Sequence, residues 1–215
     1  MSIQQIEPAS LFDSNIYMIM GSDLTVLIDT GTGFGIDAMI PSIRKHLGGR
    51  HLDAVILTHR HFDHVGGLGR IIAEFSPDHV FAGPADAVPL REGDSESTLG
   101  TKFGGSIAST SITDYREGDI IDLGGHTLRC IETPGHTIGS ICIYDESSHA
   151  LFSGDTVFFD GVGNTIHPTG SQEMLIRSLR RLQDLEINGF YPGHGPALSK
   201  GGNEFVKRGL ALLGE

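Results

Sequence analysis

Short apolar runs separated by glycine-rich turns recur along the first part of the chain. Segments 3–7, 15–20 and 24–29 have the length and composition of strands, and the third ends in the sequence TVLIDTG, which places Asp29 at a strand end. Segment 52–58, LDAVILT, is a continuous apolar run of the kind found in buried strands. The pattern therefore predicts a sheet whose strands end in polar turns.

Other segments repeat their apolar residues with helical spacing. Ile36, Met39, Ile40, Ile43 and Leu47 follow an i, i+3, i+4, i+7 pattern that two glycines close. A second helix is predicted over 68–75, a third after the capping residue Ser171, with its apolar face over 175–182, and a fourth near 203–213. These amphipathic helices are expected to cover sheet faces.

Strand patterns return in the second half of the chain, at 119–122, 126–132, 138–145, 149–153 and 188–191. Between the halves, residues 92–117 are rich in glycine, serine and threonine, which is typical of a long loop or a lid. Strands and helices in this mixed order indicate one α/β layered domain over residues 1–215.

Composition narrows the classes of function. The chain has 215 residues and a net charge of −12 with no basic stripe, so nucleic acid is not an expected partner. No apolar run reaches the ~18 residues of a membrane span, and the N-terminus does not resemble a signal peptide. Cys130 and Cys142 favour free buried thiols, although neighbouring strands could bring them together. We expect a cytoplasmic protein that acts on a small molecule, with no nucleic-acid or membrane partner.

The densest group of polar side chains follows the apolar run at 52–58. The sequence THRHFDH places His59, His61, Asp63 and His64 within one turn. A bare H-x-H is weak evidence for metal binding, but H-x-H-x-D-H is far more specific, and its spacing suits two neighbouring metal positions better than one.

Three later strand ends carry one such residue each. His136 lies in PGHT, Asp155 in SGDT and His194 in YPGHGP, each beside a glycine turn. Ligands of α/β sheets gather outside one end of the strands, so these residues are expected to converge with the first cluster. Nitrogen and oxygen donors without thiolate suit zinc, iron or manganese.

Together, THRHFDH, PGHT, SGDT, YPGHGP and LIDTG resemble the metallo-β-lactamase superfamily, and especially its glyoxalase II-like hydrolases. The resemblance implies a four-layer αββα sandwich with two divalent metal ions, zinc being favoured over iron or manganese. It implies that His59, His61 and His136 hold one metal, that Asp63, His64 and His194 hold the other, and that Asp155 bridges both. Asp29 would orient a ligand histidine.

The implied chemistry is hydrolysis of a small-molecule ester or thioester by hydroxide bound to both metals, with Asp63 and Asp155 as catalytic residues. Two departures from glyoxalase II are visible. Asn164 stands where those enzymes usually carry a basic residue, and the sequence ends soon after YPGHGP. From these, lactoylglutathione is expected to be a poor substrate.

Alternatives remain open at this level. An iron-dependent persulfide dioxygenase would bind one iron through His59, His136 and Asp155, and a lactonase is a rival among the hydrolases. A β-lactamase, a nuclease and a non-catalytic metal scaffold are less favoured. Among the remaining residues, His167 favours an exposed loop position over substrate contact and Tyr191 favours packing. Phe158 and Phe159 could wall a pocket or fill the core.

Overall fold

The computed structural model describes residues 2–215. Its strands form a six-stranded sheet in the order β1-β2-β3-β4-β5-β6 and a five-stranded sheet in the order β11-β10-β9-β8-β7. The first sheet comprises β1 (Ser2–Ile6), β2 (Ile16–Met20), β3 (Thr25–Ile28), β4 (Ala54–Leu57), β5 (His79–Ala82) and β6 (Thr113–Asp114). The second comprises β7 (Ile120–Asp122), β8 (Thr127–Glu132), β9 (Ile141–Asp145), β10 (Ala150–Gly154) and β11 (Phe190–Pro192).

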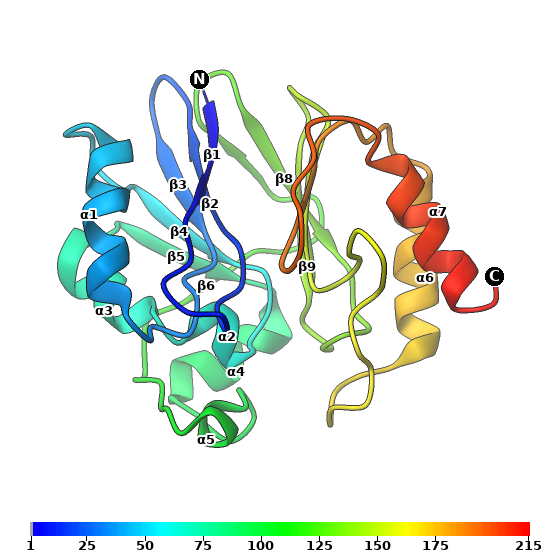
Figure 1. The fold of residues 1–215 in the computed structure, drawn as a ribbon, viewed down its shortest axis with the longest axis horizontal. Coiled ribbons are helices and arrows are strands. Elements are labelled where there is room, and N and C mark those ends of the chain that lie inside the picture. The colour runs from blue at the N-terminus through cyan, green and yellow to red at the C-terminus, as the bar shows by residue number, and fades with distance from the viewer. Residues whose placement is uncertain (1) are drawn as a thin grey trace.

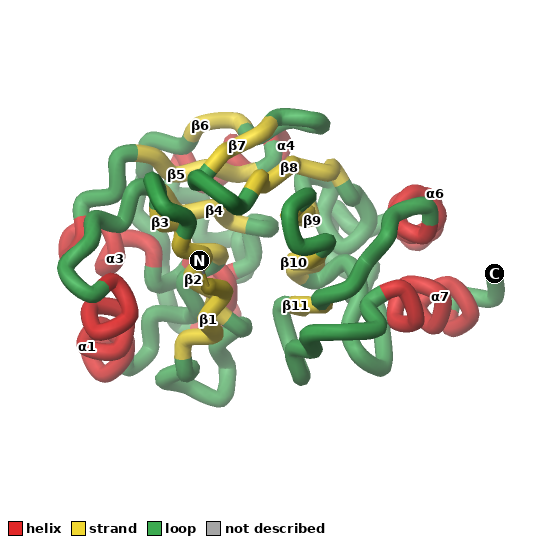
Figure 2. Tube along the Cα trace, turned by 90° about the horizontal axis from the view of Figure 1, so that it is seen from above, coloured by secondary structure: helices red, strands yellow, loops and turns green. Residues whose placement is uncertain are grey.

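Helices cover the outer faces of the two sheets, as the view from above shows (Figure 2). Helices α1 (Ile36–Leu47) and α3 (Leu68–Phe75) flank the first sheet, and α6 (Gln172–Gln183) and α7 (Asn203–Leu212) flank the second. The short helices α2 (Phe62–Val65) and α5 (Gly100–Phe103), together with α4 (Pro84–Glu92), lie toward the lower edge in Figure 1. The predicted αββα sandwich is thus confirmed.

Three apolar clusters join these four layers. One lies between α1, α3 and the first sheet, and includes Ile43 and Val55. A second, with Ile56 and Phe152, lies between the sheets, and a third, with Leu175 and Leu179, joins the second sheet to α6 and α7. β4 is buried along its whole length because its two faces contribute to two of these clusters.

The predicted elements largely appear, with differences at their ends and in the middle of the chain. The side chain of Ser171 caps α6 by accepting a hydrogen bond from the amide of Met174. The segment 138–140 forms a turn before β9 instead of the start of that strand. Segment 92–117 is not one long loop, since it contains α5 and β6. β5 and α4 were not predicted at all.

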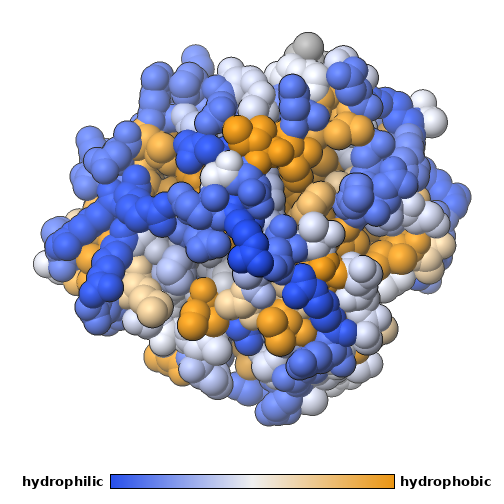
Figure 3. Space-filling model, turned by 180° about the vertical axis from the view of Figure 1, so that it is seen from behind, coloured by the Kyte–Doolittle hydropathy of each residue, from blue (hydrophilic) through white to orange (hydrophobic). Residues whose placement is uncertain are grey.

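The face drawn in Figure 3 is mostly hydrophilic, and the two cysteines are free, as the sequence predicted. Hydrophilic residues cover much of the rear face, with hydrophobic patches between them (Figure 3). Cys130 and Cys142 are buried free thiols, as expected. None of the helices within residues 2–215 has the length and apolar character that crossing a bilayer requires.

Candidate metal centre

All seven predicted ligands meet where strands of both sheets end. His59 follows β4, His61 to His64 open α2, and His136, Asp155 and His194 follow β8, β10 and β11. Their donor atoms form three overlapping groups in which every atom lies within 4.8 Å of the others. The groups are His59/His61/His136, His59/His64/Asp155 and Asp63/His64/His194. The sequence prediction that these side chains converge is therefore confirmed in geometry.

Hydrogen bonds at Nδ1 orient three of the imidazoles. Nδ1 of His64 donates to Asp29 Oδ2 over 2.7 Å, and Nδ1 of His136 donates to the carbonyl oxygen of Asn164 over 2.7 Å. Nδ1 of His59 lies 3.1 Å from the hydroxyl of Thr58, which itself donates to Asp29. Each ring thus presents the lone pair of Nε2 to the centre, which is the arrangement that metal-binding histidines require.

Several donor atoms at the centre lack a partner. Nε2 of His59, Nε2 of His64 and Oδ1 of Asp155 are buried without a hydrogen bond to any residue among 2–215. Nε2 of His64 lies 3.2 Å from Oδ1 of Asp155, so a lone pair faces a carboxylate oxygen. Such a pair needs a positive charge between its atoms, either a proton on the ring or a cation.

The pKa values of the metal-free protein reflect this crowding. Burial, followed by repulsion from the other histidines, holds the pKa of His59 well below its usual value. Burial and His136 lower the pKa of His61 to about 3. Burial also lowers the pKa of His64, but Asp155, Asp29 and Asp63 outweigh it and raise that pKa well above 6.5. His59 and His61 are thus neutral nitrogen donors, whereas the carboxylates around His64 favour a positive charge at its position, which a bound cation would supply.

Asp155 lies at the middle of the cluster. Its Oδ1 faces His64, and its Oδ2 lies 3.6 Å from Nε2 of His136 and 3.7 Å from Nε2 of His194. Burial alone would raise its pKa, but His64, His194 and His136 lower it. One carboxylate therefore contacts members of both predicted ligand sets.

The backbone around the centre is tightly fitted. Asp29 has a φ of 59°, a left-handed conformation that non-glycine residues seldom adopt, and its carboxylate accepts from the amide and hydroxyl of Thr58 as well as from His64. A Cβ on Gly193 would lie 2.2 Å from Oδ1 of Asp155 and 2.7 Å from Cε1 of His64. Only glycine lets the last motif approach the centre this closely.

Two further contacts hold the motifs together, and the sequence patterns did not indicate either. Asp86 of α4 pairs with Arg60 and accepts hydrogen bonds from the hydroxyl of Thr137 and the amide of Gly139, joining the first and second motifs. The hydroxyl of Tyr17 donates to the carbonyl of Pro192 over 2.8 Å and so joins β2 to the last motif. Both residues lie in elements that carry no recognisable motif.

An open cleft of about 480 Å³ lies over the cluster. Its lining combines five predicted ligands, namely His61, Asp63, His136, Asp155 and His194, with Leu99, Lys102, Phe103, Phe158, Val162, Asn164 and His167. Its volume falls within the range of small-molecule sites. The cluster is therefore accessible to a small substrate.

The structure shows which of the remaining aromatic residues lie in the cleft and which pack in the core. His167 is half-buried in its loop and lines the cleft, with its ring 5.3 Å from that of His61, so contact with a substrate stays a prediction. Phe158 lines the cleft, whereas Phe159 packs against Phe205 in the core. Tyr191 stacks on Phe152, which confirms its packing role.

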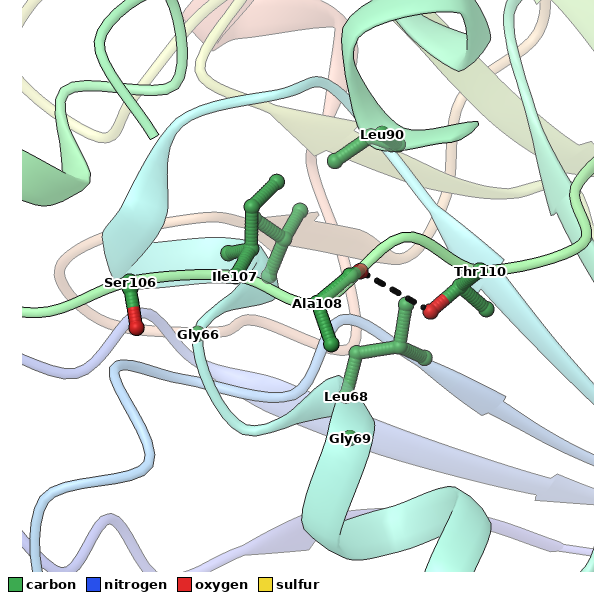
Figure 4. A pocket seen from close by; sticks show the side chains of 9 residues that line it. Gly66, Leu68, Gly69, Leu90, Ser106, Ile107, Ala108 and Thr110 are labelled. Atoms are coloured by element: carbon green, nitrogen blue, oxygen red, sulfur yellow. Dashed lines mark hydrogen bonds between the residues drawn. The ribbon is translucent and has the colours of Figure 1, made fainter. Parts of the chain in front are cut away.

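A separate cavity of about 200 Å³ lies between α2, α3, α4 and segment 106–110 (Figure 4). Leu68, Leu90 and Ile107 point into it, and the hydroxyl of Thr110 donates to the carbonyl of Ala108. Its lining residues are glycine, apolar or hydroxyl-bearing, and none of them is titratable, whereas the cleft over the cluster is lined by histidines and aspartates.

Comparisons with known proteins agree with the geometry. Residues 9–194 match the family model of the metallo-beta-lactamase superfamily. A protein named "probable metallo-hydrolase MJ0888" from Methanocaldococcus jannaschii is 33% identical over 192 residues, which cover 86% of this chain and 88% of the relative. The acyl-coenzyme A thioesterase MBLAC2 of Homo sapiens is 30% identical over 169 residues, which cover 67% of this chain and 58% of the human protein. The chain thus spans little more than half of that relative.

Solved structures share the whole fold. The crystal structure of TTHA1623 in a di-iron-bound form has a TM-score of 0.76 and 26% identity, covering 97% of this chain and 98% of its own. The structure of ETHE1 from Myxococcus xanthus has a TM-score of 0.73 and 23% identity, covering 98% of this chain and 83% of its own. The second likeness concerns the fold alone.

Proposed function

This chain belongs to the metallo-beta-lactamase superfamily, and we propose that it is a metal-dependent hydrolase that cleaves a small-molecule thioester or ester. The observation that carries the proposal is that the His59/His61/His136 and Asp63/His64/His194 groups are linked by a third group, His59/His64/Asp155. The Nε2 and Oδ1 atoms of this third group are buried without a partner among residues 2–215, and Asp155 lines an open cleft. Two divalent cations, with zinc favoured over iron or manganese, would supply Lewis acidity there and lower the pKa of water from ~15.7 toward ~7.

The ligand assignment is part of the proposal. His59, His61 and His136 would hold one cation, Asp63, His64 and His194 would hold the other, and Asp155 would serve both. The Nδ1 hydrogen bonds of His59, His64 and His136 support the assignment because they fix the tautomer that a ligand needs. The presence of Asp63, His64 and His194 at the centre favours two cations over the single iron of a dioxygenase.

Two carboxylates of the chain are assigned catalytic roles in this proposal. Asp63 lines the cleft, and its Oδ2 lies 3.1 Å from Nε2 of His194. Burial raises its pKa, but His64 and His194 together lower it, so Asp63 is ionised at neutral pH and can accept the proton released when water attacks the carbonyl. Asp63 and Asp155 are therefore the proposed catalytic residues.

A covalent acyl-enzyme is not part of the proposal. Burial raises the pKa of Cys142 to about 11 and that of Cys130 further, so both thiols stay protonated, and neither lines the cleft. The proposed reaction is therefore direct attack by water on the carbonyl carbon, without a covalent intermediate on the protein. The named thioesterase relative supports a thioester as the substrate class, and the glyoxalase II-like branch remains part of this proposal.

The test combines metal analysis with a substrate panel. The purified protein is assayed by elemental analysis and with thioesters, a lactone, a phosphodiester and a persulfide. We expect about two metal ions per chain and the highest kcat/KM on a thioester or ester. A single tightly bound iron together with oxygen uptake on the persulfide would overturn the proposal in favour of a dioxygenase.

A further inference from the structure

The ring of His61 lacks an orienting partner outside the metal centre. Nδ1 of His59 meets a hydroxyl and Nδ1 of His136 donates to a carbonyl, and such partners fix the direction of a ligand ring. The His61 ring has one hydrogen-bonding contact among residues 2–215, in which its Nδ1 lies 2.8 Å from Nε2 of His136. The place of His61 is therefore set by the backbone that carries it.

Asp86 holds this backbone from behind. Asp86 is fully buried in the first turn of α4, and its Oδ2 accepts from the amide of Arg60 over 2.9 Å. Its Oδ1 accepts from Nε of Arg60 over 2.8 Å. Arg60 lies between His59 and His61, and its side chain is only 8% exposed. One carboxylate thus fixes both the amide and the guanidinium of the residue that separates two ligands.

The same carboxylate holds the motif that carries His136. The hydroxyl of Thr137, the next residue, donates to Oδ2 of Asp86 over 2.6 Å, and the amide of Gly139 donates to Oδ1 over 3.1 Å. A Cβ on Gly139 would lie 2.5 Å from Oδ1 of Asp86, so glycine is what lets this loop come so close. Donors from two separate motifs therefore converge on one pair of oxygens.

The buried carboxylates Asp29 and Asp86 hold different donor groups. We call His59/His61/His136 the first group and Asp63/His64/His194 the second group. Asp29 accepts from Nδ1 of His64, a member of the second group. Asp86 bonds no member of the second group among residues 2–215, and the residues that it bonds adjoin ligands of the first group. The three rings of the first group, with centroids 4.6–4.8 Å apart, come from the two motifs that Asp86 joins.

We propose that Asp86 is a positioning residue for the first group, and that it controls the affinity of one of the two cation positions. It sets the distance between the motif that carries His59 and His61 and the motif that carries His136. The inference rests on the two-cation site of the proposed function, and it gives each cation position its own buried carboxylate. Asp86 is not among the residues that line the cleft, so it acts through the ligands and not on a substrate.

The test is titration of the metal-free protein with Zn²⁺ against a chromogenic chelator, which yields an affinity for each group. His136→Ala identifies the binding step of the first group because it removes one of its ligands, and His194→Ala identifies the step of the second group in the same way. Asp86→Asn is the main variant. It preserves the size of the side chain, but it turns an NH₂ group toward donors and removes the charge that compensates the buried Arg60.

A second pair of variants changes a single donor to Asp86. Thr137→Val removes the hydroxyl that donates to Oδ2, and Thr137→Ser keeps it. These two variants leave the pairing of Asp86 with Arg60 in place. They therefore test the same link with less risk to folding.

We expect Asp86→Asn to weaken the first-group step about 10- to 100-fold, the usual cost of losing a residue that orients ligands, and to leave the second-group step unchanged. Thr137→Val should weaken the first-group step about tenfold, and Thr137→Ser should restore it. A residue that serves stability alone would lower the melting temperature of the metal-free protein without changing the ratio of the two affinities.

Equal losses at both steps in Asp86→Asn, or no loss at either, overturn the inference. If Asp86→Asn does not fold, the ratio of the two affinities in Thr137→Val decides in the same way. An unmodified protein with a single Zn²⁺ step contradicts the two-cation site and with it the proposed function. Two Zn²⁺ steps without hydrolysis of any ester or thioester overturn the proposed function alone, since the role of Asp86 is measured by metal affinity.

Discussion

Asp29 offers the sharpest test of how the centre is built. Three donors point at its two carboxylate oxygens: the amide of Thr58 at Oδ1, and the hydroxyl of Thr58 and Nδ1 of His64 at Oδ2, all within 2.7–2.8 Å. Asn has one acceptor oxygen, so Asp29→Asn leaves at least one of these donors facing an NH₂ group. Because Asn also tolerates the left-handed backbone found at position 29, the substitution changes the hydrogen bonds without adding strain.

The expected effect follows from the tautomer of His64. When Asn presents its NH₂ group to Nδ1, the ring moves its proton to Nε2, and the lone pair that faces Asp155 is lost. Loss of an orienting partner of this kind typically costs 10- to 100-fold in metal affinity, which corresponds to about 1.4–2.7 kcal/mol. We expect the affinity of the Asp63/His64/His194 group to fall by that factor.

The assay is titration of the metal-free protein with Zn²⁺ against a chromogenic chelator, which resolves two binding steps. Asp145→Asn is the matched control, since buried Asp145 likewise accepts from a histidine, His126, over 2.6 Å and from the amide of Thr127 over 3.1 Å. The control should lower stability and leave both binding steps unchanged. Equal zinc affinity of Asp29→Asn and the unmodified protein would refute the account of His64.

Three other outcomes follow from the same geometry. Asp155→Ala should lower the metal content of both groups together, whereas His194→Ala should lower mainly one, as elemental analysis after gel filtration would show; full retention by both variants contradicts the ligand assignment. Gly193→Ala should reduce kcat at least tenfold because the added Cβ would lie 2.2 Å from Oδ1 of Asp155. Gly69→Ala is the control: its added Cβ would have no atom within 4 Å, so this substitution should raise the free energy of unfolding by about 1 kcal/mol in denaturant unfolding. Removing metal with a chelator should lower the melting temperature by about 5–10 °C at metal concentrations near 100 times Kd, and an unchanged melting curve would argue against metal binding by the folded state.

Sequence patterns predicted the elements that have a strong period and missed those that do not. α1 and α6 repeat their apolar residues at helical spacing, and β4 is a continuous apolar run, so all three were predicted. β5 has only four residues, with His79 exposed at one end. α4 contains Pro84 and Pro89 and buries both apolar and charged residues, so its pattern does not resemble that of an amphipathic helix. Tertiary packing decides these elements, and local spacing does not report it.

The same division holds for the site. The ligands were predictable because each follows an apolar strand and lies beside a glycine turn, and the ends of strands in layered sheets converge. Asp86 and Lys102 were not predictable because they lie in segments without a motif, and only the fold brings Asp86 against Arg60 and Lys102 to the cleft. The expectation drawn from Asn164, that lactoylglutathione is a poor substrate, stays a prediction.

Substitutions at the metal centre and substitutions in the walls of the cleft are expected to have different effects. The donor atoms lie on strand ends that three apolar clusters and the Asp29 and Asp86 hydrogen bonds hold in place, so substitutions there disturb metal binding and folding together. The walls that face a substrate come instead from α5 and from the loop after β10, where Lys102 and His167 line the cleft. Residues in such segments can be replaced at little cost in stability. Substrate preference is therefore expected to vary with α5 and this loop, while the hydrolytic centre stays constant, and exchanging residues 99–103 should alter which thioester is preferred without altering metal content.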